Sequence, residues 1–172
     1  METFRAMGEH SGDEASARAA RLREQRTEEA CAELAELAAR WPELAGVAYL
    51  TACAHDSLGL EAEAVPHYER ALRLGSGLSE EDRHGAFLGL GSTYRVLGRY
   101  REAVTTLRRG LEEFPADAAL RTFLAMALYN VGEPREAVRT LLLVTAATSG
   151  DARVQEYRRA IGYYADHLDE TQ

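Results

Sequence analysis

The chain has 172 residues, of which 46% are apolar and 28% charged, and its formal net charge is −8. Its length suits a single domain, and its apolar content is too high for a disordered chain. The acidic balance argues against nucleic acid as a partner, because nucleic-acid binding depends on a basic surface.

The composition also limits location and chemistry. Residues 1–25 lack the apolar core of a secretory signal, and the longest apolar run is too short to span a bilayer, so we expect a cytoplasmic protein with no membrane partner. All 20 basic residues are arginine, which excludes chemistry that requires lysine. The abundance of alanine and arginine, typical of a GC-rich bacterial genome, favours helices.

The first part of the chain predicts a tail followed by an incomplete helical unit. Residues 1–12 are polar and contain glycine, which indicates a flexible tail. Within residues 13–44, Ala30, Leu34 and Leu37 follow a helical spacing that closes near Pro42. We expect a partial repeat here.

A short segment then recurs three times, at residues 58–65, 97–104 and 131–138, with spacings of 39 and 34 residues. In each copy an apolar residue is followed by a glycine that can adopt the left-handed conformation that ends a helix. A Glu-Ala-Val sequence follows, whose glutamate favours the start of the next helix through the helix dipole and whose small alanine permits close helix packing. The repeated unit is therefore helix, tight turn, helix.

These units predict one solenoid over residues 13–168, with full repeats at about 45–78, 84–117 and 118–151. Five extra residues near 79–83 predict a longer loop and an additional helical turn. The last segment places Val154, Tyr157 and Ile161 at helical spacing. We expect a single helix over residues 152–168 to cap the stack, because a terminal repeat otherwise leaves its apolar face open.

The repeat resembles the tetratricopeptide repeat family, whose pattern is Trp-x2-Leu-Gly-x2-Tyr, then Ala-x3-Phe, then Pro. The middle unit matches best, with Phe87, Leu90-Gly91, Tyr94, Ala103, Leu107 and Pro115. The ending near Tyr157-Arg158-Arg159 also resembles the bacterial group 5 proteins of this family. The resemblance implies an all-α, right-handed α-α superhelical solenoid. The positions that it assigns to the framework of the repeats are Gly59, Ala64, Gly91, Tyr94, Gly98, Ala103, Pro115, Gly132 and Ala137.

The resemblance also implies a concave groove, lined by the first helix of each pair, that binds a protein or peptide without catalysis. Carried over by position, the groove residues are Tyr49, Leu50, Cys53, Asp56, Leu88, Ser92, Arg95, Phe123, Met126, Tyr129, Asn130 and Tyr157. An apolar and aromatic wall with few charges suits an extended or helical peptide. The basic clamp for chaperone C-termini is absent from the corresponding positions, so we do not expect a chaperone-tail adaptor.

The search for catalytic chemistry is negative. The chain contains no HExxH, GxSxG, P-loop or dinucleotide-binding motif. Cys53 and His55 are two residues apart on a predicted helix and point to different faces, and a metal or nucleophile site with His67 would need all three to converge. We therefore expect no enzyme, no catalytic residue, no metal and no cofactor.

A second surface offers an alternative function. The outward side of the third unit carries Leu142-Leu143, where the earlier units carry charged pairs. Exposed apolar pairs can mark association sites. Either the capping helix covers this pair, or the protein is a structural subunit that forms a homodimer through it.

Overall fold

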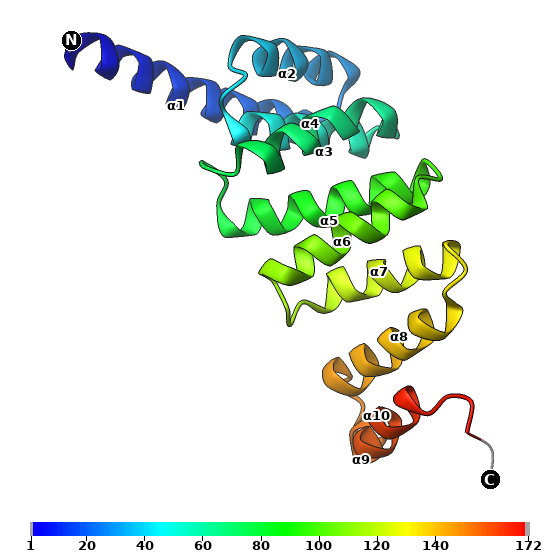
Figure 1. The fold of residues 1–172 in the computed structure, drawn as a ribbon. Helices are drawn as coiled ribbons and strands as arrows, with labels where there is room; N and C mark the ends of the chain where they lie inside the picture. Colours follow the sequence, from blue (N-terminus) through cyan, green and yellow to red (C-terminus); the bar gives the residue numbers. More distant parts are fainter. Residues whose placement is uncertain (1, 171–172) are drawn as a thin grey trace.

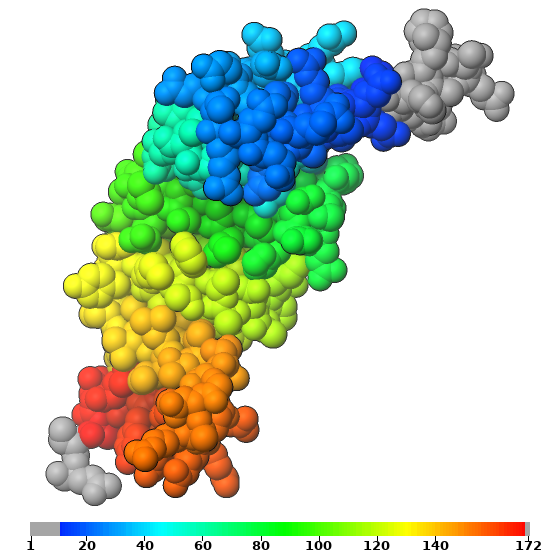
Figure 2. Space-filling model, turned by 180° about the vertical axis from the view of Figure 1, so that it is seen from behind, coloured from blue at the N-terminus to red at the C-terminus, as the bar shows by residue number. Residues whose placement is uncertain are grey.

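The computed structural model describes residues 2–170 of the chain, with side chains described from residue 11 onward. In this part all regular structure is helical, and ten helices follow one another along a stack. The helices α1 and α10 lie at opposite ends of the stack (Figure 1). Seen from behind, the layers succeed each other in sequence order (Figure 2). The predicted fold class, an all-α solenoid, is confirmed.

The helices form antiparallel pairs. Preceding the three repeats are α1 (Glu2–Gln25) and α2 (Glu28–Arg40). The repeats themselves consist of α3 (Ala45–Ser57) with α4 (Glu61–Leu74), α5 (Glu80–Val96) with α6 (Tyr100–Glu113), and α7 (Ala118–Asn130) with α8 (Pro134–Thr148). Two short helices close the chain, α9 (Ala152–Glu156) and α10 (Arg158–Asp166).

The turn inside each repeat depends on a glycine with positive φ. Gly59, Gly98 and Gly132 have φ values of 73°, 74° and 85°. This left-handed conformation costs glycine no steric strain, so the helix ends there and the next one begins two residues later. Local sequence alone thus determines the hairpin of each pair.

Small residues bring the two helices of a pair together. Ala64, Ala103 and Ala137 are buried in the second helices, where larger side chains would separate the pair. Gly91 is the tightest case, since a Cβ atom there would come within 2.5 Å of Cγ of Leu107. The central core is continuous across α3–α8, and its largest fully buried side chains include Phe87, Leu107, Leu120 and Leu128.

The stack bends toward its first helices. The helices α3 and α5 contact each other directly, as do α5 and α7. In contrast, no Cα of α6 lies within 8 Å of one in α4 or α8 over the described residues. Closer spacing on one side of a stack curves it toward that side, so α3, α5 and α7 line the inner surface.

The structure departs from expectation at both ends. The backbone of residues 2–12 is helical as part of α1, where the sequence predicted a tail; residue 1 and the side chains of residues 1–10 lie outside the described part, and flexibility of this segment stays a prediction. At the other end, the single helix expected over residues 152–168 is broken at Tyr157 into α9 and α10. The five extra residues near 79–83 lengthen α5 to 17 residues, whereas α3 and α7 each have 13.

Candidate peptide-binding surface

Several residues expected to line the inner surface are engaged in packing. Tyr49, Leu88 and Phe123 are half-buried against the central core. Leu50 packs instead against a second core, formed mainly by α1, α2 and α3. These four side chains shape the inner wall but offer only part of their surface to a partner.

Asp56 and Cys53 belong to an internal polar cluster. The carboxylate of Asp56 accepts hydrogen bonds from the hydroxyls of Tyr68, at 3.1 Å, and Thr93, at 3.0 Å. The Tyr68 hydroxyl also lies 3.7 Å from Sγ of Cys53. Because these residues come from α3, α4 and α5, the cluster ties consecutive repeats together. We therefore assign it a structural role.

The protonation of this cluster does not favour a nucleophile. Burial raises the pKa of the Cys53 thiol, which disfavours the reactive thiolate at neutral pH. Burial likewise raises the pKa of Asp56, partly offset by its two hydrogen bonds. His55 stacks on His67 at 5.3 Å between ring centroids, and its Nδ1 lies 2.8 Å from the Thr51 carbonyl, which accepts its hydrogen bond.

Toward the C-terminal end, the inner surface becomes an open apolar hollow of about 410 Å³ between α5, α7 and α8. Met126 and Tyr129 are exposed on its α7 side, Tyr129 by 68%. The residues that line it are Arg95, Ala125, Met126, Tyr129, Asn130, Ala137, Val138 and Leu141. Four of the predicted groove residues therefore meet here.

Two polar atoms in the wall of this hollow lack hydrogen-bond partners within the described part of the chain. They are Nε of Arg95 and Oδ1 of Asn130, both shielded from water. Buried polar groups of native proteins are normally satisfied, so these two atoms mark a polar edge of the apolar hollow whose pairing the described part of the chain does not supply. Arg95 is the only charged side chain among the lining residues.

The remaining predicted positions lie outside this hollow. Ser92 is half-buried on α5, one turn before Arg95. Tyr157 is 60% exposed at the break between α9 and α10, and it does not line the hollow. The structure thus does not bring Tyr157 together with Met126 and Tyr129.

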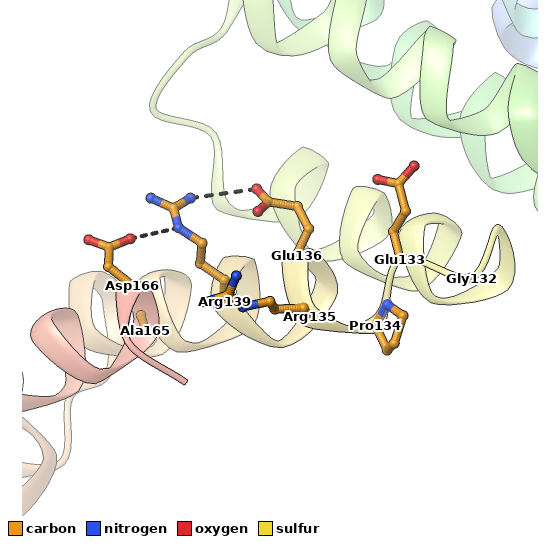
Figure 3. Close-up of a pocket in the computed structure, with 8 residues that line it drawn as sticks. All are labelled: Gly132, Glu133, Pro134, Arg135, Glu136, Arg139, Ala165 and Asp166. Carbon is orange, nitrogen blue, oxygen red and sulfur yellow. Dashed lines mark hydrogen bonds and ion pairs between the residues drawn. The ribbon is translucent and has the colours of Figure 1, made fainter. Parts of the chain in front are cut away.

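A second hollow, of about 470 Å³, lies between the start of α8 and α10 and is strongly charged (Figure 3). Its centre is Arg139, whose guanidinium lies 2.7 Å from Asp166 and 3.5 Å from Glu136. Arg135 pairs with Asp169 at 2.9 Å. Arg139 thus joins α8 to Asp166 of α10, and Arg135 joins α8 to Asp169 beyond the end of α10. Within the described residues, the charged side chains of this hollow are therefore engaged in ion pairs.

The outward pair Leu142-Leu143 is half-buried, and Leu143 lines a shallow hollow with Leu111 and Leu124. Val138 and Leu141 are more exposed than Leu142 and Leu143, and neither was among the residues predicted from the sequence to form the site. A signal was available, because both residues occupy core positions in the third copy of the repeated segment, which does not recur within residues 139–172.

The family described as Tetratrico peptide repeat matches residues 45–168, which is more than half of the chain. The chain belongs to the tetratricopeptide repeat family. The resemblance noted in the repeat motif is confirmed, and repeats of this family generally mediate protein–protein interactions and are typically non-catalytic. No curated protein was found to match the chain.

Within residues 11–170 of this tetratricopeptide repeat protein, no group of three His, Cys, Asp or Glu side chains lies close enough to hold a metal ion. Over residues 2–170, no helix combines the length and the hydrophobicity needed to cross a lipid bilayer.

Proposed function

We propose that this tetratricopeptide repeat protein is a non-catalytic scaffold or adaptor that binds a segment of another protein on its inner surface. The observation that carries the proposal is the convergence of Arg95, Met126, Tyr129 and Asn130 on one open apolar hollow. Concave apolar surfaces with a few polar groups suit a peptide segment, since apolar contacts supply affinity and the polar groups fix orientation.

The charge of the hollow indicates the kind of segment. Arg95 is the only charged lining residue, and its Nε has no partner within the described residues. A carboxylate on the bound segment would satisfy this guanidinium with a charge-assisted hydrogen bond. We therefore expect an apolar segment that carries an acidic residue. The net charge of −8 further supports a protein partner over nucleic acid, and a cytoplasmic location remains our expectation from the sequence.

The alternative, a structural homodimer through Leu142-Leu143, has less support. Both leucines are half-buried, and α10 packs along α8. Light scattering on the purified chain separates the two readings, because a homodimer through this pair should dissociate when Leu142 and Leu143 are replaced by serine.

The experiment for the scaffold is affinity capture from a bacterial lysate with the full chain, followed by mass spectrometry. Tyr129→Ala removes an exposed ring from the hollow and should reduce capture of the specific partner. Tyr163→Ala is the matched control, because Tyr163 is 55% exposed on α10 and lies outside the hollow. Equal capture by wild type, Tyr129→Ala and Phe123→Ala would contradict a partner site on the inner surface.

A further inference from the structure

The last helix pair exposes a face that the earlier pairs bury. Val138 and Leu141 on α8 are 46% and 40% exposed. Their counterparts in the two preceding repeats occupy the same positions after the turn glycine, and none is more than 7% exposed: Val65, Tyr68, Val104 and Leu107. The same type of side chain, at the same place in the repeat, is thus covered twice and open once.

In the earlier repeats the cover is the first helix of the following repeat. The helix α5 packs on α4, and α7 packs on α6. The contact is close, since a Cβ atom at Gly89 on α5 would lie 2.5 Å from the hydroxyl of Tyr68 on α4. After α8, no described helix occupies the equivalent position. No Cα of α9 or α10 lies within 8 Å of a Cα in α7 over the described residues, and among the helices of the repeats α10 contacts α8 alone.

The sequence offers a reason why α9 and α10 leave this face of α8 open, although α10 packs on another part of α8. Asp151 caps α9 at the position where Asp117 caps α7, 34 residues earlier, so a fourth first helix starts in register. In that register the buried pair Leu124-Ala125 of α7 corresponds to Arg158-Arg159. Seating this helix like α7 would bury two guanidinium groups in an apolar interface, which is costly without partners. The helix breaks at Tyr157 instead, and both arginines remain exposed.

We propose that the face formed by Met126, Tyr129, Val138 and Leu141 is a docking site for an amphipathic α-helix of a partner protein. The helix takes the place that α5 and α7 occupy on the preceding pairs and extends the stack by one helix. This inference rests on the proposed function and specifies the form of its partner segment. It is based on the exposure of Val138 and Leu141 on α8, which line the same hollow as Arg95.

The helices that fill the equivalent places define the chemistry of the partner. The buried stripe of α7 contains Leu120, Leu124 and Leu128, spaced by four residues along one face. A partner helix with such a stripe, and without arginine in it, buries its apolar face against α8 as α7 does against α6. A carboxylate on its side facing α7 pairs with Arg95.

The test uses the protein's own α7 as a probe. A fluorescently labelled peptide of residues 117–131 is titrated with the full chain and followed by fluorescence anisotropy. We expect saturable binding that the double variant Val138→Ser/Leu141→Ser weakens by at least about tenfold, because it removes the two apolar contacts of the site. Val96→Ser is the matched control: Val96 is 57% exposed at the end of α5, outside the hollow, and its loss should leave binding unchanged.

A second double variant probes the explanation without altering the site. Arg158→Leu/Arg159→Ala removes the charges that keep the chain's own last segment off α8, so this segment should compete with the peptide and lower its apparent affinity. Absence of saturable binding to the wild-type chain, or binding that survives both double variants, overturns the proposal. A homodimer of the wild-type chain that dissociates in Val138→Ser/Leu141→Ser also overturns it, since the occupant is then a second copy. In each case reduced capture by Tyr129→Ala would leave the scaffold function standing.

Discussion

Leu107 and Leu141 occupy the same position in successive repeats, and replacing each by alanine measures what the following helix contributes. Leu107 is fully buried in the central core, to which α5 and α7 both contribute, so Leu107→Ala leaves a cavity and should cost about 3–4 kcal/mol of unfolding free energy. Leu141 is 40% exposed, and water can enter the space that its side chain leaves. Leu141→Ala therefore loses only part of a transfer free energy, about 1 kcal/mol.

Urea unfolding followed by circular dichroism at equilibrium gives both values on the same protein. The losses of unfolding free energy in the two variants should differ by about 2–3 kcal/mol, since Leu107 is enclosed by packed helices and Leu141 is partly open to water. Similar losses for Leu107→Ala and Leu141→Ala would contradict an open position at Leu141. They would mean that Leu141 is covered in solution, by the chain's own end or by a second molecule.

Three further predictions concern the helix pairs. Gly91→Ala should lower the unfolding free energy by about 1–3 kcal/mol in urea titrations, because the added Cβ would come within 2.5 Å of the enclosed Leu107. Gly162→Ala is the control: no atom lies within 4 Å of the added carbon, so this variant should be neutral or stabilising. Asp117→Ala removes the side chain that accepts a hydrogen bond from the Leu120 backbone N–H at 2.7 Å and should cost about 1 kcal/mol in thermal melts, and a negligible change would show that the cap is dispensable. Burial, His55 and Arg70 lower the pKa of His67 from 6.5 to about 4, so between these pH values the unfolded chain binds a proton that the folded chain excludes. The unfolding free energy should therefore fall as the pH drops from 6.5 to about 4. His67→Gln should flatten this pH dependence of the urea midpoint, and an unchanged dependence would contradict the assignment to His67.

The hairpin of each repeat could be predicted from the sequence because its causes are local. A glycine with positive φ ends one helix at Gly59, Gly98 and Gly132, and a small alanine near the start of the next helix lets the pair close. These features recur at fixed spacing, so the family and the solenoid fold were predictable as well. The extra turn at the start of α5 was visible as a five-residue insertion.

The candidate site was predictable only in part, because it depends on contacts between repeats. Position in the repeat placed Arg95, Met126 and Tyr129 on the inner surface, and these three residues meet in the hollow. It also placed Asp56 there, but Asp56 is engaged by Tyr68 and Thr93 from the next two helices, a network that no single repeat contains.

The helical pairs, the turns between them and their order in the stack follow from the sequence, since each is set by residues a few positions apart. Which core positions are left uncovered depends on contacts between distant segments and became clear from the fold. Val138 and Leu141 carry the pattern of buried residues, and they are exposed because burial depends on the helix that follows. At the positions of the buried Leu124 and Ala125 of α7, 34 residues later, the chain carries the exposed Arg158 and Arg159.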